Sequence, residues 1–531
     1  MLAFVIVLIS GILATGCAKT TPTPTTSPSP TPTTQPTTSV EPQYGGTLRI
    51  IETSEVNCLG WGPEQGGPED YYDRSFAIET LVRQDSNTGL PVPFLAESVI
   101  EDSSAKTITF VLREGIHFQD GTDLDATACK WNLDQLRTGA WTSPDFTHVS
   151  SIDIVDNRTV RVTFTDWDTV FLRLICWDSG MVSPTAYEQN GVDWMRNNPV
   201  GTGPFKLVSF QRDIKKVFEK WDGYWQEGKP YLDRVEISVV ADPTVQIASF
   251  LSGEADIFEK TNTTAANNLK GNAGVKLFQS SVAGELECII GDSSNPDSPF
   301  SKLEVRQAVS YAIDRNAINN SVFKGFGKIT NQIAPPGSVY YNPNLVGYPY
   351  DAGKARELLE AAGYTSGLDI TLTYPSNALF QDMNTAIQGY LDAVGIRVTL
   401  EPLGGGQFGE VGMSKGWTNG MIGTGLIDDV EVGVDMIFWL SAGSGTGVAK
   451  SIIHPDDVEN ASSLMLSAPS SSAKQAYVWE LQSLMFDKYC IFTPIVFLPS
   501  VTAWSTKVHD EINEKYPPQD PWSFANTWMT Q

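Results

Sequence analysis

Apolar and polar residues alternate along this chain with two different periods, which predicts strands interspersed with helices. In the stretch 106–118 apolar residues recur at alternate positions, as expected of a strand with one buried face, and 159–164 repeats the pattern. Between them, residues 126–137 have helical spacing, and Asp125 stands where a helix cap is expected. The first half is therefore predicted to mix both elements.

The second half of the chain repeats the order helix, glycine, strand. The helix predicted at 351–362 ends at Gly363 and precedes a strand, and the same order recurs around Gly395. This alternation predicts an α/β fold in which helices cover a mostly parallel sheet. A further helix near 303–313 is expected to bury one face, made of Val305, Ala308, Val309, Ala312 and Ile313.

The N-terminus has the pattern of an export signal. Residues 1–16 are uncharged, and small residues follow their apolar run, as before a cleavage site. Cys17 comes next, which resembles the bacterial lipobox, where this cysteine becomes the lipid-carrying first residue. Ala14 stands where leucine is usual, so an uncleaved anchor or a simple secretory signal stays an alternative. Each of these signals would export the folded part.

Residues 17–43 are predicted to form a stalk. From Thr20 to Ser39 every residue except Gln35 is Thr, Pro or Ser, a composition that forms no core and favours extended backbone. The folded body is expected to begin near Tyr44.

Charge and composition exclude several classes of protein. The 531 residues include 62 acidic and 36 basic side chains, a net charge of −26, which is too acidic for a nucleic-acid binder. Hydrophobic residues make up 41%, enough for a large core in roughly two to four lobes. No uncharged apolar run beyond the N-terminus has the length of a membrane span, which excludes a multi-span transporter.

Cysteines and histidines predict neither a metal centre nor a bound cofactor. The four histidines are scattered, and no CxxC pair or zinc motif occurs. Most cysteines other than Cys17 are expected to be buried thiols, with one long-range disulfide possible. They are Cys58, Cys129, Cys176, Cys288 and Cys490.

Two glycine-rich stretches imitate nucleotide-binding motifs without completing them. GGGQFG at 404–409 has dinucleotide-binding spacing, with Asp428 and Asp429 about 20 residues later, but poor helix formers follow it. Residues 443–451 resemble a phosphate loop, except that Ala449 replaces a required glycine. No GxSxG motif occurs. No catalytic residue is therefore predicted, and a secreted hydrolase is the less favoured class.

A series of segments from about Gly45 to about Arg397 carries a family resemblance. They are GGTLRI, FVLREGIHFQDGTDLDA, NPVGTGPFKLVSF at 198–210, KWDGYWQEGKPYLDRVEI, VRQAVSYAIDRNAI and YPYDAGKARELLEAAGY, and PIVFLPSVTAWS lies near the C-terminus. In this order they resemble the family 5 extracellular solute-binding proteins, the peptide and nickel class that serves ABC importers.

The resemblance implies a type II periplasmic-binding-protein fold, with two α/β lobes joined by a hinge and an additional smaller α/β domain. The expected boundaries are a signal peptide at 1–16, the lipidated cysteine and stalk at 17–43, a discontinuous lobe I at 44–85, 198–300 and 495–531, an accessory domain at 86–197, and lobe II at 301–494.

Two motifs within these segments are assigned structural roles. Gly201 and Gly203 permit backbone angles closed to other residues, and Pro204 fixes φ, so a sharp turn between lobes is expected there. Asp314 and Arg315 lie at the end of a predicted helix, where a solvated or capping role is expected.

The family resemblance implies a receptor and not an enzyme. A ligand that touches both lobes stabilises their closed arrangement, and ABC permease subunits would accept the loaded receptor. The lipid on Cys17 would hold a monomer at the extracytoplasmic face of the cell membrane, in the periplasm or at the cell surface. A small peptide or similar polar solute is the predicted cargo. An oligosaccharide or a metal chelate is the alternative cargo, and a passive adhesin is a third class.

Ligand contacts are predicted at two places. Peptide-binding members of the family commonly hold the free amine with an aspartate in the last third of the chain, where Asp428 and Asp429 are the candidates and Trp439 is an aromatic neighbour. The alternative is that these carboxylates are solvated loop charges. The loop after the first strand offers Trp61 and Tyr71 as an aromatic cleft wall.

Overall fold

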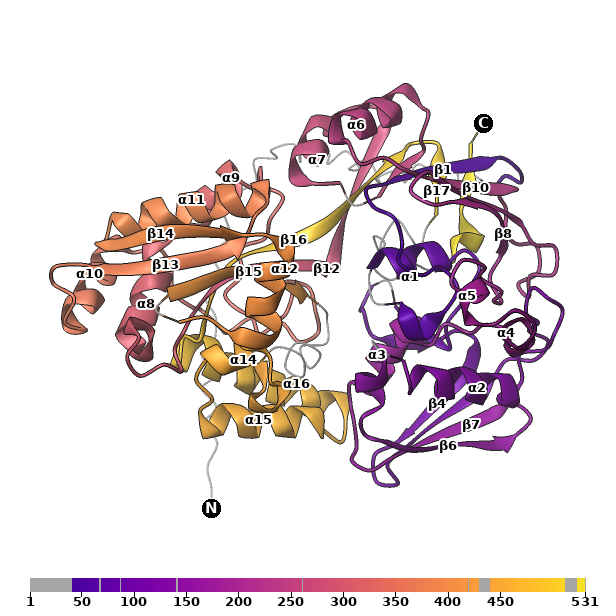
Figure 1. Ribbon diagram of the computed structural model, residues 1–531, viewed down its shortest axis with the longest axis horizontal. Coiled ribbons are helices and arrows are strands. Elements are labelled where there is room, and N and C mark those ends of the chain that lie inside the picture. Colours follow the sequence, from indigo (N-terminus) through magenta and orange to yellow (C-terminus); the bar gives the residue numbers. More distant parts are fainter. Residues whose placement is uncertain are drawn as a thin grey trace, which may run out of the picture. The chain divides into compact units, whose positions relative to one another are not determined.

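A ten-stranded mixed sheet organises the fold (Figure 1). In spatial order its strands are β14 (Ile396–Leu403), β13 (Leu368–Pro375), β15 (Gly420–Asp428), β12 (Val275–Gly291), β16 (Phe492–Ser505), β11 (Ile257–Phe258), β1 (Thr47–Glu52), β10 (Arg234–Val239), β9 (Lys215–Lys220) and β8 (Phe205–Gln211).

This computed structural model describes residues 41–65, 68–85, 87–139, 142–259, 261–418, 420–428, 440–510 and 523–530. Pro42–Gln531 form one compact unit. The predicted signal peptide, Cys17 and nearly all of the stalk lie outside the described residues. Within the described ranges, no helix is long and apolar enough to span a bilayer.

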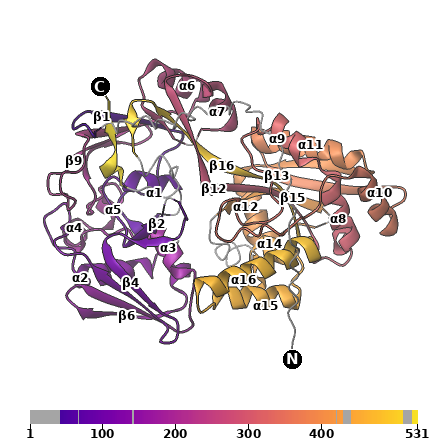
Figure 2. The ribbon, with the colours of Figure 1, turned by 180° about the vertical axis from the view of Figure 1, so that it is seen from behind.

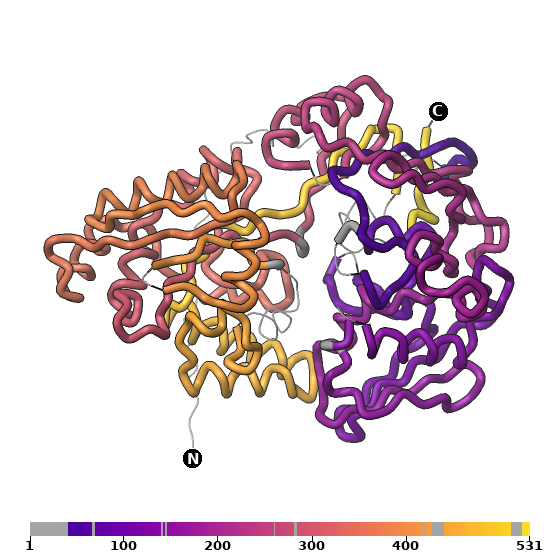
Figure 3. The backbone as a smooth tube through the Cα atoms, viewed as in Figure 1, coloured from indigo at the N-terminus to yellow at the C-terminus, as the bar shows by residue number. Residues whose placement is uncertain are grey.

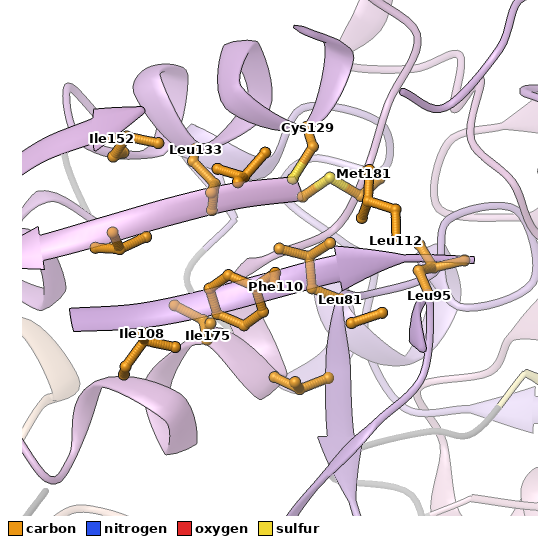
Figure 4. Close-up of a cluster of buried hydrophobic side chains, with 14 of the residues drawn as sticks. Leu81, Leu95, Ile108, Phe110, Leu112, Cys129, Leu133, Ile152, Ile175 and Met181 are labelled. Atoms are coloured by element: carbon orange, nitrogen blue, oxygen red, sulfur yellow. The ribbon is translucent and has the colours of Figure 1, made fainter. Parts of the chain in front are cut away.

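A separate four-stranded sheet builds a second core. Helix α2 (Ala126–Leu136) packs on it, and Asp125 caps this helix by accepting a hydrogen bond from the Ala128 amide, as the sequence predicted. Figure 4 shows buried side chains of this core, among them Phe110 and, on α2 itself, Leu133. The order of strands in this sheet is β4 (Ala96–Asp102), β5 (Thr107–Leu112), β7 (Thr159–Phe164) and β6 (Val149–Asp156). Two further sheets have two strands each: β2 (Val82–Gln84) with β3 (Pro91–Pro93), and β17 (Val508–His509) with β18 (Trp528–Met529).

The remaining helices cover the sheets. They are α1 (Pro68–Arg74), α3 (Phe171–Asp178), α4 (Pro184–Asn190), α5 (Val192–Met195), α6 (Pro243–Ser252), α7 (Thr263–Leu269), α8 (Leu303–Ala312), α9 (Arg315–Ser321), α10 (Ala352–Ala361), α11 (Ala378–Asp392), α12 (Gly405–Glu410), α14 (Gly447–Ser451), α15 (Asp456–Leu466) and α16 (Ser471–Gln482).

Helices α8, α10 and α11 pack on one face of the main sheet, while α14, α15 and α16 pack on the other (Figure 2). The predicted apolar face of α8 is buried, and Gly363 and Gly395 both adopt the left-handed backbone after their helices, with φ of 92° and 95°. These predictions are confirmed.

The direction of the strands differs from the prediction of a mostly parallel sheet. Strands β13, β14 and β15 are parallel to one another, as are β1, β10 and β11. The hairpin of β8 and β9 is antiparallel, and so are the long strands β12 and β16. The helix-glycine-strand repeats predicted only the two sets of parallel strands. Strands β12 and β16 pair with strands that are distant in the sequence, so they leave no such repeat.

Strands β12 and β16 cross between the two parallel sets (Figure 3). At one end β16 pairs with β11, and at the other end β12 pairs with β15. Their ladder is interrupted by two register shifts, one between Gln279 and Gly284 and one between Glu287 and Cys288. A bulge of this kind bends a strand and locally disrupts its pairing.

Close packing, and not unusual backbone angles, explains the glycines of the GTGPF segment. Neither Gly201 nor Gly203 has a positive φ, which corrects the prediction. A Cβ on Gly201 would lie 2.4 Å from the Ala77 carbonyl oxygen, and one on Gly203 would lie 2.7 Å from the Ala77 carbonyl carbon. The Gly203 amide donates to that same Ala77 oxygen at 2.9 Å. The segment thus lies directly on the backbone that follows α1.

Gly201→Ala is expected to lower the free energy of unfolding by about 1–3 kcal/mol, because backbone atoms must shift to admit the methyl group. Chemical denaturation measures this loss. Gly389→Ala in α11 is the matched control: its Cβ would meet nothing within 4 Å, so helix propensity should stabilise the protein by up to about 1 kcal/mol. Equal effects of the two substitutions would contradict the close-packing explanation.

Arg315 is buried, not solvated, which corrects part of a second prediction. Asp314 does cap α9, by accepting from the Ala317 amide at 3.0 Å. Arg315 as a whole is 8% exposed, and its guanidinium donates to three backbone carbonyls. It therefore joins β16, α8 and the loop before α10.

The five cysteines after Cys17 are all buried and free. The expectation of buried thiols is confirmed, and the possible long-range disulfide is not formed among them.

Candidate binding site where the strand ends meet

The carboxyl ends of the two parallel sets face each other along the crossing strands. Strand β11 runs toward the middle of β16 and ends with Phe258 opposite Ala503. Strand β15 runs the opposite way along β12 and ends with Asp428 opposite Gly284, which itself pairs with Pro499. On β16 the two pairing partners, Pro499 and Ala503, are four positions apart, which corresponds to about 13 Å along the strand. Ligands of open α/β sheets bind at carboxyl ends, so this gap is the candidate site.

A buried ion cluster lies at the first set of strand ends. The Lys216 ammonium on β9 contacts Glu52 at the end of β1, Glu55 at 2.6 Å and Asp73 on α1 at 2.8 Å. Burial lowers the pKa of Lys216, but the charges of Asp73 and Glu52 outweigh it and raise that pKa overall. Burial, with the charge of Asp73, raises the pKa of Glu52. Three carboxyl groups in reach of one ammonium form a cation-binding arrangement that Lys216 itself fills.

Glu79, in the segment that follows α1, forms a second buried polar centre. Its carboxylate accepts hydrogen bonds from Tyr224 Oη at 2.6 Å, Trp225 Nε1 at 2.8 Å and Thr202 Oγ1 at 3.0 Å. Burial nevertheless raises the pKa of Glu79 to about 7. Thr202 belongs to the GTGPF segment, so this carboxylate ties that segment to the chain after α1.

Glu79 is expected to make stability fall as pH rises. Its carboxyl group has a higher pKa in the folded protein than its ordinary value of 4.5, so the folded state binds the proton more tightly and loses that advantage between about pH 4.5 and pH 7. The loss should be on the order of 3 kcal/mol. It is measured as the difference in unfolding free energy between the wild type and Glu79→Gln across that range. Parallel pH profiles would contradict the assignment.

The structure places the predicted aromatic residues in packed surroundings. Trp61 is 5% exposed and stacks on Tyr187 with ring centroids 4.8 Å apart. Tyr71 donates from its hydroxyl to Asp178 Oδ1 at 2.8 Å, and the Arg74 guanidinium lies 4.6 Å from its ring centroid. That Trp61 and Tyr71 contact a ligand stays a prediction. The two side chains do not belong to the same cluster of packed side chains.

The predicted acidic residues lie at the second set of strand ends. Asp428 is the last residue of β15, and only its backbone is described. Asp429 and Trp439 lie outside the described residues. Their roles as ligand contacts also stay predictions. The pairing of β15 with β12 brings two glutamates that the sequence analysis missed, Glu285 and Glu287, beside this strand end. The sequence feature that could have identified these two glutamates is the alternation of acidic and apolar residues in GELECII at 284–290.

A polar contact joins the segment before α3 to the end of α15. Thr169 donates from its amide to the Leu466 carbonyl at 3.2 Å, and Trp167 Nε1 donates to the Ala468 carbonyl at 3.2 Å. A cavity of about 380 Å³ opens here, lined by both segments and by Lys474. This contact links the four-stranded sheet to the helices beside β12 and β15.

The two long crossing strands thus join two α/β halves whose parallel strands end toward each other. The model of the bacterial extracellular solute-binding proteins, family 5 (middle region), matches residues 91–442. The chain belongs to this family, and the type II periplasmic-binding-protein fold implied by the sequence is confirmed.

Individual relatives are binding proteins. The glutathione-binding protein GsiB of Salmonella paratyphi A is 32% identical over 330 residues, which cover 59% of this chain and 61% of the relative. The substrate-binding protein CtaP of Listeria monocytogenes superposes with a TM-score of 0.82 at 19% identity, covering 92% of this chain and all of that one. DppA of Helicobacter pylori, in complex with peptide STSA, superposes at 0.73 with 21% identity, covering 92% and 99%.

Proposed function

We propose that this protein captures a small peptide or a similar polar solute outside the cell and delivers it to an ABC importer. The observation that carries the proposal is the pair of strand ends that face each other across β12 and β16, with a bulge between them. A solute bound there touches both parallel sets and stabilises the closed arrangement by its differential affinity. The glutathione-binding relative supports a peptide-like cargo, because glutathione is itself a small peptide.

The proposed moving bodies follow the sequence-based boundaries. Lobe I comprises 44–85, 198–300 and 495–531, lobe II comprises 301–494, and 86–197 form the accessory domain. The hydrophobic clusters support this division, since one gathers around the four-stranded sheet and others around β1 and β10 or around β13 and β14. The receptor acts as a monomer and has no catalytic role.

Differential scanning fluorimetry of the exported body tests the cargo. A ligand that binds only the folded state at 100 times its Kd adds about 2.7 kcal/mol to the free energy of unfolding. Dipeptides, tripeptides and glutathione are expected to raise Tm, whereas oligosaccharides and nickel chelates are not. Stabilisation by a sugar or a chelate alone would replace the peptide proposal. Turnover of a bound peptide would indicate a hydrolase, and no saturable binding at all would indicate an adhesin.

Anchoring through a lipid on Cys17 is the second part of the proposal. The lipobox-like sequence before Cys17 and the Thr/Pro/Ser-rich stalk after it support an anchor at the extracytoplasmic face of the membrane. More than one acyl chain is needed for stable retention. In a bacterial host the wild type should fractionate with membranes and incorporate labelled palmitate, while Cys17→Ala should do neither. Equal labelling of both proteins would contradict the anchor.

A further inference from the structure

A small set of hydrogen bonds joins the segment before α3 to the C-terminal end of α15, as Figure 1 and Figure 2 show for the two backbones. The last carbonyls of a helix have no donor within the regular helix, so they accept hydrogen bonds from outside it. The Thr169 amide reaches the Leu466 carbonyl at 3.2 Å, and the Thr169 hydroxyl lies 3.1 Å from the same oxygen and 3.3 Å from the Met465 carbonyl. Trp167 Nε1 donates at 3.2 Å to the Ala468 carbonyl, just beyond the helix. Two residues before α3 therefore cap α15.

The turn that carries these donors is held by its own hydrogen bonds. Asp168, between Trp167 and Thr169, is 8% exposed, and its Oδ1 accepts from the Val170 amide at 2.8 Å and from the Phe171 amide at 3.2 Å. These bonds lie within the segment, so they fix the turn into α3 whether or not α15 is near. A preorganised turn loses little conformational freedom when it makes a further contact.

The contact is largely polar and loosely packed. Separate hydrophobic clusters lie on its two sides, one around the four-stranded sheet and one that includes α15 and α16, and Leu90 from the loop between β2 and β3 packs against the second. A cavity of about 380 Å³ lies between the two clusters, lined by Leu172 of the first and Tyr340 of the second. Permanent protein interiors are close-packed, whereas contacts between parts that move are more polar. The composition of this contact is therefore that of one that opens.

The bonds across the contact have the strength that a reversible contact requires. When the contact opens, water replaces the lost partners, so each bond stabilises the closed arrangement only modestly, although a modest free energy still changes an equilibrium several-fold. Lys474 on α16 adds a donor from the other side, at 3.3 Å from the Thr169 carbonyl. Residues 167–169 belong to the proposed accessory domain, whereas α15 and α16 belong to the proposed lobe II. The contact thus bridges two parts that separate when the receptor opens.

We propose that Trp167 and Thr169 form a latch with the C-terminal end of α15, and that this latch holds the receptor closed on its solute. This inference rests on the proposed function and gives the accessory domain a part in it. The solute draws the two parallel sets together, the latch then forms, and reopening becomes slower. Trp167 and Thr169 are positioning residues, because they act on the solute through closure.

A latch of this kind affects release and not capture. The solute enters the open receptor, in which the latch is not formed, so the association rate constant does not depend on it. Release requires the latch to break, so its loss raises the dissociation rate constant and the Kd by the same factor. A merely structural contact would behave differently, because its loss would lower the Tm of the unliganded protein and leave the dissociation rate constant unchanged.

Two conservative variants test the latch. Trp167→Phe removes the Nε1 donor and keeps an aromatic ring, and Thr169→Val removes the hydroxyl and keeps the shape of the side chain. Each should raise the dissociation rate constant and the Kd about 2- to 10-fold, with the association rate constant unchanged. Stopped-flow fluorescence with glutathione and trialanine as probes measures both rate constants, and scanning fluorimetry measures the unliganded Tm, which should stay the same in Thr169→Val.

Trp194→Phe and Thr385→Val are the matched controls, because they make the same chemical changes outside the contact. Trp194 lies on α5 and is 39% exposed. Thr385 is exposed on α11, and its hydroxyl donates to the Gln381 carbonyl of the same helix at 2.7 Å. Neither control should change the rate constants or the Kd. Equal effects of Thr169→Val and Thr385→Val would contradict the latch.

Hydrogen exchange resolved to single amides shows when the latch forms. The Thr169 amide, which donates to Leu466, should exchange quickly in the unliganded protein and slowly at saturating glutathione or trialanine. The Val170 and Phe171 amides donate to Asp168 within the segment, so their protection should be the same in both states, which makes them internal controls. Equal protection of the Thr169 amide with and without the probe would overturn the inference, because the contact would then be permanent.

The outcomes distinguish this inference from the proposed function. If no peptide of the fluorimetry screen binds the wild-type protein, the proposed function fails and the inference fails with it. If the wild type, Trp167→Phe and Thr169→Val all bind the probe and release it at equal rates, only the latch is refuted.

Discussion

Replacing Lys216 with methionine is expected to lower the free energy of unfolding by about 3–5 kcal/mol, because removing one partner of a buried ion cluster leaves the others uncompensated. Lys216 is fully buried, and its ammonium is shared by Glu52, Glu55 and Asp73. Methionine fills a similar volume, so the loss reports the charge and not a cavity. Denaturant titration at neutral pH measures it.

Two variants separate charge pairing from packing at this cluster. Lys215→Met removes the neighbouring lysine, whose ion pair with Glu236 is partly exposed, and should cost no more than about 1 kcal/mol. Glu52→Gln removes one of three acids that share a single ammonium, and should be neutral or stabilising. Equal losses for Lys215→Met and Lys216→Met would contradict the assigned role of the cluster.

Arg315→Met is expected to cost about 3–6 kcal/mol, since three backbone carbonyls lose their buried donor. The guanidinium donates to Pro494 at 2.6 Å and to Ser310 and Tyr348 at 3.1 Å each. Pro494 lies on the crossing strand β16, so the variant should also loosen the junction of β16 with α8 and α9. Hydrogen exchange at amides of β16 and α8, together with the unfolding free energy, measures both effects.

Arg315→Lys and Arg356→Met complete this test. A lysine ammonium retains the charge but not the fork of donors, so it should recover only part of the lost stability. Arg356 is exposed on α10, and its replacement by methionine should change the unfolding free energy by less than about 0.5 kcal/mol. Full stability of Arg315→Lys would show that charge, and not donor geometry, is what this site requires.

Local patterns predicted local elements well. The apolar face of α8, the Asp125 cap and the left-handed Gly363 and Gly395 each depend on neighbours within a few residues, and each is confirmed. The family segments predicted the fold in the same way, since each is a contiguous string. All of these patterns are set by residues that lie close together in the sequence.

Long-range contacts could not be predicted in this way. Glu52 and Lys216 are 164 residues apart, and nothing in either neighbourhood indicates that they meet. The close approach of Gly201 to Ala77 and the antiparallel course of β12 and β16 are likewise properties of the assembled sheet. For the same reason the alternation around Glu287 indicates a strand but not its neighbour, and only the pairing of β12 with β15 places Glu287 opposite Gly425.

The distance between two spin labels, one on α4, which packs against the core around β1 and β10, and one on lobe II, tests most directly whether the two halves close on a solute. Cysteines introduced at the exposed positions Glu188 on α4 and Glu360 on α10 can be labelled selectively, because the five native cysteines after Cys17 are buried. Pulsed electron paramagnetic resonance measures this distance. When a stabilising peptide is added, the mean distance should change and the distance distribution should become narrower. An unchanged distribution at saturating peptide would contradict closure about β12 and β16.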